Sequence, residues 1–95
     1  MTEIMLDATA WQSRDDLYAE LLPALGAPSW HGHNLDALDE SFRAGGILRV
    51  EYPLLIFIRN LDNIQPSIRG YLTKLASLIT DLHDVNGINI KLEFL

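Results

Sequence analysis

The longest regular pattern in this chain is an apolar stripe with helical spacing, and it constrains the fold more than any other feature. Residues three or four positions apart lie on one face of an α-helix, and the apolar residues with this spacing are Ile68, Leu72, Leu75, Ile79 and Leu82. Pro66 suits the first turn, where its missing N–H costs nothing, and Asn63 or Gln65 can cap the helix before it. The pattern therefore predicts a long helix with one buried face.

Two segments beside this helix have the patterns of β-strands. Leu54 to Ile58 is a continuous apolar run, typical of a strand covered on both faces, and it follows Pro53, which cannot donate to a strand ladder. Ile88 to Phe94 alternates apolar and polar residues, which is typical of a strand with one face in water. Gly87 marks the turn between the helix and this second strand.

The first half of the chain has shorter patterns of the same kinds. Ile4 to Leu6 is a strand candidate. Ser13 and Asp16 resemble a capping box, and the apolar stripe after them predicts a helix near 14–25. A second helix is expected after Asn34, a favoured N-cap, and its apolar stripe is Leu35, Leu38 and Phe42.

The order strand, helix, helix, strand, helix, strand predicts the fold class. Parallel strands need crossover connections, and every connection between the expected strands contains a helix. We therefore expect an α/β fold in which a small three-stranded parallel sheet is packed with helices. A chain of 95 residues is long enough for one core, and it has no repeat or linker, so residues 1–95 are expected to form a single domain.

The charge balance excludes some partners. Thirteen acidic side chains against seven basic ones give a formal net charge of −6, which would repel nucleic acid and anionic membranes. The N-terminus has no basic or apolar leader pattern, and the absence of cysteine is compatible with a reducing compartment. We expect a soluble cytoplasmic protein, monomeric when free, that binds neither nucleic acid directly nor membranes.

An acidic cluster on the second helix indicates a partner of a different kind. At about 100° per residue, Asp36, Asp39 and Glu40 lie together on a different side from the apolar stripe. These carboxylates could simply complement the positive helix N-terminus, at ~0.3–1 kcal/mol, and pair with Arg43. Because the cluster follows a loop with aromatic residues, it favours contact with a basic surface.

The chemistry-bearing residues favour neither catalysis nor metal binding. Acid–base catalysis needs carboxylates whose environments separate their pKa values, and a solvated helix face offers no such environment. The sequence has no glycine-rich phosphate loop and no nucleophile motif. His31 and His33 could share an ion, but Gly32 between them is flexible and no further ligand is fixed nearby. We expect no enzyme activity, no cofactor and no metal.

Two blocks of sequence resemble the signature of one known family. The run Gly-His-Asn-Leu-Asp-Ala-Leu at 32–38 and the later Val-Glu-Tyr-Pro-Leu at 50–54 look like the signature of the barstar family of ribonuclease inhibitors. The order of the expected elements also fits that family. The resemblance implies a barstar-like fold and a basic extracellular or toxin-type ribonuclease as partner. The acidic helix and the adjacent loop would occlude its active site, with carboxylates in the place of RNA phosphate.

Some positions in these blocks depart from the family pattern. Glu40 stands at the principal inhibitory carboxylate, which moves the charge by one methylene, and Asp39 replaces an aromatic residue and could take over part of that role. The resemblance places an aromatic contact pair at Trp30 and His31, although Trp30 could equally pack its loop onto the sheet. A further acidic contact is expected from the long helix, at Asp81 or Asp84.

The expected partner contacts come from the loop before the acidic helix, the helix itself, the loop after it and the long helix. They are Trp30, His31, Asn34, Asp36, Asp39, Glu40, Arg43, Gly45 and Asp81. A function of a different class stays open beside inhibition. The same fold could serve as an interaction module that binds another basic protein without inhibiting it.

Overall fold

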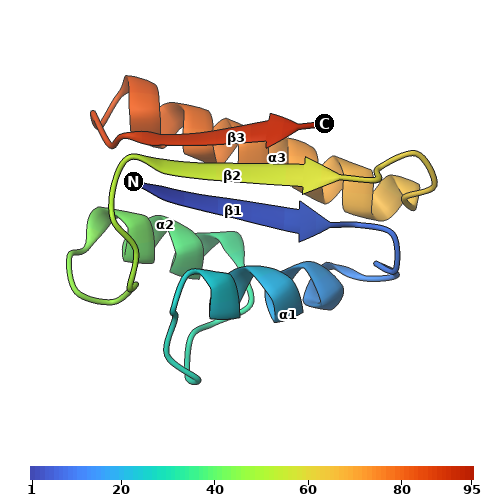
Figure 1. Ribbon diagram of the computed structural model, residues 1–95, viewed down its shortest axis with the longest axis horizontal. Helices are drawn as coiled ribbons and strands as arrows, with labels where there is room; N and C mark the ends of the chain where they lie inside the picture. The colour runs from blue at the N-terminus through green and yellow to red at the C-terminus, as the bar shows by residue number, and fades with distance from the viewer.

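A computed structural model describes residues 1–95 and contains three strands and three helices (Figure 1). The strands are β1 (Thr2–Asp7), β2 (Leu54–Arg59) and β3 (Ile90–Phe94). The helices are α1 (Arg14–Ala24), α2 (Leu35–Arg43) and α3 (Pro66–Asp84). The predicted α/β class and the predicted order of the elements are confirmed.

The three strands form one parallel sheet in the order β1-β2-β3. β2 is the central strand, and Ile56 lies between Ile4 of β1 and Leu92 of β3 in the register. The connection from β1 to β2 contains α1 and α2, and the connection from β2 to β3 contains α3. Each parallel pair thus has the helical crossover that parallel pairing requires.

One face of the sheet carries the core. Alternate side chains of a strand point to the same face, and on this face the buried ones are Ile4, Leu6, Leu54, Ile56, Ile58 and Ile90. α3 runs behind the sheet in Figure 1 and buries the whole predicted stripe. Leu75 of that stripe and Ile56 of the sheet are each 1% exposed, which confirms the prediction that both are buried in the core.

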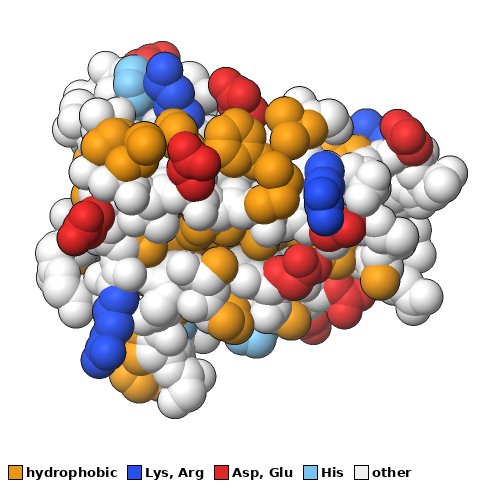
Figure 2. All heavy atoms as spheres, viewed as in Figure 1, with side chains coloured by type: hydrophobic (Ala, Val, Ile, Leu, Met, Phe, Trp, Pro, Cys, Tyr) orange, Lys and Arg blue, Asp and Glu red, His pale blue; other side chains and the backbone are white.

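The opposite face of the sheet is open, so the expectation that β2 is covered on both faces is wrong. Leu55 and Phe57 are only partly buried, and Met5 of β1 is 50% exposed. Figure 2 shows hydrophobic side chains on this side of the molecule with acidic and basic ones among them. In the register Leu55 lies between Glu3 and Lys91. Long polar side chains on the edge strands therefore flank the apolar residues of the central strand, and no second layer of helices is needed.

The helix starts follow the sequence signals. Asp16 accepts hydrogen bonds from the N–H groups of Gln12 and Ser13, at 2.7 and 3.2 Å, which confirms the predicted capping box of α1. Gln65 and not Asn63 occupies the N-cap of α3, and Pro66 is in the first turn. No helix combines the length and the apolar character needed to cross a lipid bilayer.

β3 begins at Ile90, later than the alternating pattern predicts. Gly87 has a positive φ of 68°, and the N–H of Ile88 donates to the carbonyl of Leu82 at 3.0 Å, so Ile88 closes the end of α3. The ladder with β2 starts at the carbonyl of Asn89, which accepts the N–H of Leu54 at 2.9 Å. The alternating pattern starts before the strand because Ile88 is apolar for a different reason: it packs against the core at the end of α3.

Candidate partner-binding site

α2 begins at a well-formed cap. The side-chain Oδ1 of Asn34 accepts the N–H of Ala37 at 2.7 Å, which confirms Asn34 as the N-cap. Leu38 and Phe42 are buried on the inner face of the helix, and Ser41 is buried beside them. The buried inner face fixes the rotation of α2, so its outer face is presented in one orientation.

The outer face of α2 carries two free carboxylates. Asp36 and Glu40 lie four residues apart on the helix, and both are exposed. Neither forms an ion pair within the chain. Side chains four residues apart are neighbours on a helix surface, so the two carboxylates form one negative patch without a cation of the chain to neutralise it.

Asp39 differs from these two acids because it is already paired. Its Oδ1 accepts a hydrogen bond from Nε of Arg43 at 2.7 Å, the pairing that the sequence spacing allows. Nη1 of Arg43 also donates to Oδ1 of Asn86, at 2.8 Å. The pairing of Asp39 with Arg43 that the spacing allows is thus present, and it leaves Glu40 without an ion-pair partner.

The bond between Arg43 and Asn86 ties α2 to the turn after α3. Nδ2 of Asn86 donates to the main-chain carbonyl of Asp81 at 3.4 Å, so Asp81 lies in the segment that meets the C-terminal end of α2. The Asp81 side chain is exposed and has no ion pair. Asp84 differs, because Nδ1 of its neighbour His83 lies 2.9 Å from its carboxylate. Of the two predicted acids on α3, Asp81 is the free one.

Trp30 and His31, in the loop before α2, have opposite environments. Trp30 is 74% exposed, so its ring is not packed onto the sheet. His31 is 5% exposed, so the expectation that its side chain contacts a partner is corrected. Its Nδ1 donates to the carbonyl of Gly32 at 2.7 Å, and its Nε2 accepts the hydroxyl proton of Ser41 at 2.6 Å. The buried imidazole joins the loop to α2.

His33 has partners of its own. Its ring stacks on Tyr18 of α1 with the centroids 5.6 Å apart, and its Nδ1 lies 3.6 Å from the carboxylate of Asp15. The hydroxyl of Tyr18 bonds to that of Tyr71 on α3, and burial, together with this bond, raises the pKa of Tyr18. The two histidines thus point to separate partners, and no three His, Asp or Glu side chains gather as a metal-binding group. Sequence reasoning missed the Tyr18–His33 contact, because no local spacing connects α1 with this loop.

The loop after α2 brings the second signature block to the site. Oη of Tyr52 donates to the carbonyl of Phe42 at 3.4 Å, and burial raises the pKa of Tyr52. Gly45 is exposed, and a Cβ added to it would have no heavy atom within 4 Å apart from its chain neighbours. The N–H of Arg49 donates to the carbonyl of Leu25 at 2.9 Å, which joins this loop to the one before α2. Both loops therefore flank the acidic helix as one unit.

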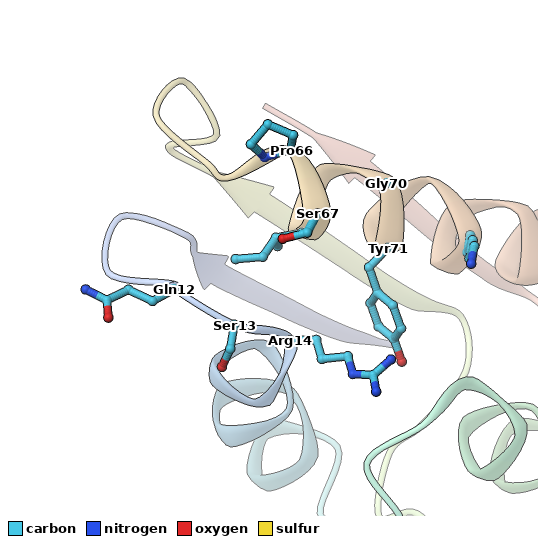
Figure 3. Close-up of a pocket in the computed structure, with 9 residues that line it drawn as sticks. Gln12, Ser13, Arg14, Pro66, Ser67, Gly70 and Tyr71 are labelled. Atoms are coloured by element: carbon cyan, nitrogen blue, oxygen red, sulfur yellow. The ribbon is translucent and has the colours of Figure 1, made fainter.

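A separate cleft of about 520 Å³ lies between the starts of α1 and α3 (Figure 3). Tyr71 points from α3 toward α1, and the guanidinium of Arg14 lies 5.5 Å from the centre of its ring. The residues that line this cleft include no carboxylate and no imidazole. It offers nothing to a basic partner, so the candidate site is the surface made by α2, its two flanking loops and the end of α3.

The sequence matches a known protein family along a segment that contains every element of this surface. The sequence matches the family described as Barstar (barnase inhibitor) over residues 1–94, which covers all three strands and all three helices. The description of that family names an inhibitor and no enzyme activity. No match was found among curated proteins. Because the match extends along nearly the whole chain, beyond the two signature blocks, the chain belongs to the barstar family.

Proposed function

We propose that this chain inhibits a microbial ribonuclease by inserting the outer face of α2 into the basic active site of the enzyme. The observation that carries the proposal is the pair Asp36 and Glu40, two exposed and unpaired carboxylates on a helix whose inner face is buried. The family, described as barnase inhibitors, supplies the class of partner. The carboxylates would face the cations that bind RNA phosphate, and inhibition would follow from occlusion.

The hydrogen bonds that hold α2 in place support this proposal. The Asn34 cap, the bond from Ser41 to His31 and the bond from Arg43 to Asn86 hold the start, the middle and the end of the helix. A surface that is ordered before binding loses less conformational entropy on association. The exposed ring of Trp30 adds an aromatic anchor beside the helix, a residue type that is enriched among the strongest contacts of interfaces.

Within the acidic face we propose Glu40 as the main inhibitory carboxylate. A partner cation that approached Asp39 would have to compete with Arg43, whereas Glu40 has no such competitor. Asp36 lies in the first turn of α2, where the helix dipole already compensates part of its charge. Asp81 would add a second acidic contact from α3, next to the C-terminal end of α2.

The direct test is an assay of RNA cleavage with increasing amounts of the chain. The nucleases are barnase and the ribonuclease whose gene lies closest to the gene for this chain. The wild-type chain should suppress cleavage by one of them at a one-to-one ratio. Truncation of an interfacial carboxylate leaves partner cations buried and unpaired, so Glu40→Ala should weaken binding by ~2–5 kcal/mol. Glu93→Ala, which removes the same charge from the exposed edge of the sheet, should inhibit like the wild type.

Ionic strength gives an independent readout of the same proposal. With a net charge of −6, the chain should associate quickly with a basic nuclease, and added salt should slow association because it screens charges beyond about 10 Å. Binding to a nuclease without loss of cleavage would contradict inhibition and favour the interaction-module function. Equal inhibition by wild type and Glu40→Ala, without salt dependence, would show that α2 is not the inhibitory surface.

A further inference from the structure

A shallow cleft of about 480 Å³ lies between the two loops that flank α2. Pro28 and Trp30 line it from the loop before the helix, and Ile47 and Arg49 line it from the loop after it. Arg49 is the one charged residue among the lining residues. The cleft thus places a single cation beside an exposed indole ring, next to a helix whose outer face is acidic.

The backbone and the Cβ of Arg49 are held in place, whereas its guanidinium has no ion-pair partner. Its N–H donates to the carbonyl of Leu25, and its Cβ packs against Gly26, where an added Cβ would lie only 2.6 Å from it. Gly26 also has a positive φ of 65°, so only glycine allows this close approach of the two loops. The guanidinium is exposed and has no ion pair within the chain.

The two arginines near α2 therefore differ in charge balance. Arg43 is compensated by Asp39, whereas Arg49 is compensated by nothing in the chain. An uncompensated cation on a surface that docks onto a basic active site repels the partner and weakens binding. A chain that docks there needs an acidic group of the partner opposite Arg49.

We infer that the cleft at Trp30 and Arg49 is a subsite for one carboxylate side chain at the rim of the bound nuclease. The inference rests on the proposed function and adds a rule for the choice of partner. Trp30 and Ile47 line the same cleft as Arg49 and would supply apolar walls around an ion pair formed there, and an ion pair is stronger where water is excluded. Nucleases with similar active sites but no acid at this position would meet an unpaired cation and bind more weakly.

The test compares Arg49→Glu with Lys91→Glu for binding to the nuclease that the chain inhibits. Both variants make the chain more negative by two charges, and Lys91 lies on the open side of the sheet. If only the overall charge matters, both variants should bind a basic nuclease more tightly than the wild type. The subsite instead makes Arg49→Glu weaker by roughly tenfold or more while Lys91→Glu is unchanged or tighter. Thermal melting of both variants should stay close to that of the wild type, since neither Arg49 nor Lys91 forms an ion pair within the chain.

Charge reversal on the nuclease identifies the occupant. Each Asp or Glu near the active-site rim is replaced by Lys, and one such variant should bind wild type weakly and Arg49→Glu well. If Glu40→Ala abolishes inhibition but Arg49→Glu binds as tightly as Lys91→Glu, the subsite is refuted and the proposed function stands. If the chain binds no ribonuclease, the proposed function fails, and the subsite fails with it because its occupant belongs to that partner.

Discussion

α3 and α2 differ in what their side chains contact. α3 has 19 residues and buries five apolar side chains against the sheet, Ile68, Leu72, Leu75, Ile79 and Leu82. α2 has only 9 residues and buries Leu38, Ser41 and Phe42, while its outer face carries free acids. α3 therefore contributes more to the buried core than α2 does, whereas the proposed binding depends on α2. Changes on the inner face of α3 and on the outer face of α2 should therefore have separable effects.

The short helix needs other means to hold its position. Isolated helices of about 12 residues or fewer are marginal in water, and α2 is shorter than that. Three polar bonds compensate. The Asn34 cap and the His31 bond to Ser41 come from the loop before α2, and the Asn86 bond to Arg43 comes from the turn after α3. Substitutions that remove these bonds should therefore change stability and binding together.

The largest expected effect is on stability and comes from α3. Leu75 is 1% exposed at the centre of the core, so Leu75→Ala should leave a cavity and reduce the free energy of unfolding by ~2–5 kcal/mol. Urea denaturation followed by circular dichroism measures this loss. At a temperature where the variant is still folded, its affinity for the nuclease should equal that of the wild type. A weaker affinity of the folded fraction would show that α3 also shapes the binding surface.

The second effect should move stability and binding together. In Ser41→Ala the buried Nε2 of His31 loses its hydrogen-bond donor, and an unsatisfied buried polar group costs ~1–3 kcal/mol. The loop with Trp30 is then held less firmly, so affinity for the nuclease should fall as well. Chemical denaturation and titration against the nuclease measure the two quantities. Ser77→Ala, an exposed serine on α3, is the matched control and should change neither.

The difference between the two helices also explains how much could be predicted from the sequence. The stripe of α3 is a local pattern, and local spacing determines which helix face is buried, so Leu75 and its neighbours were predictable. The open face of the sheet was not, because the cover of β2 depends on how many layers the rest of the chain supplies. Leu55 and Phe57 are apolar whether or not a second helical layer lies over them.

The site was predictable in outline, but two of its contacts within the chain were not. Asn34, the acids of α2 and the Asp39–Arg43 pair follow from spacing along one helix. The buried imidazole of His31 is satisfied by Ser41, ten residues away in the sequence. The guanidinium of Arg43 is held by Asn86, in the turn after α3. The one local signal for the first was a serine between two apolar positions of the stripe, which indicates a buried polar partner.

A smaller effect is expected at the start of α2. Asn34→Ala removes the side-chain acceptor for the N–H of Ala37 and should reduce the free energy of unfolding by ~0.5–2 kcal/mol. Asn34→Ser should keep most of the stability, because serine is an equally favoured N-cap. Loss of the cap frays the first turn, where Asp36 lies, so Asn34→Ala should also weaken nuclease binding more than Asn34→Ser does. Equal affinities for the two variants would mean that the first turn is ordered by the partner.

Asp7, at the end of β1, is an acid whose carboxylate has partners within the chain. Its carboxylate accepts hydrogen bonds from the hydroxyl and the N–H of Thr9 and from the amide of Asn60, and Arg59 lies 3.6 Å away. These hydrogen bonds, that of the Thr9 hydroxyl first, lower the pKa of Asp7 from 3.8 to about 2. Unlike Glu40, this acid should contribute to folding and not to binding.

The smallest expected effect is therefore a change in acid stability. Since the pKa of Asp7 is lower in the folded chain, the unfolded chain binds more protons between about pH 4 and pH 2, and the contribution of Asp7 is complete above this window and lost as the pH falls through it. Asp7→Asn should be less stable than the wild type at pH 6, and the difference should shrink as the pH approaches 2. Thr9→Val, which removes the first of these donors, should raise the pKa of Asp7, as followed by NMR of its carboxyl carbon. Parallel stability curves for wild type and Asp7→Asn across this window would contradict the role of the carboxylate, and unchanged inhibition by both variants at neutral pH would confirm that its role is confined to folding.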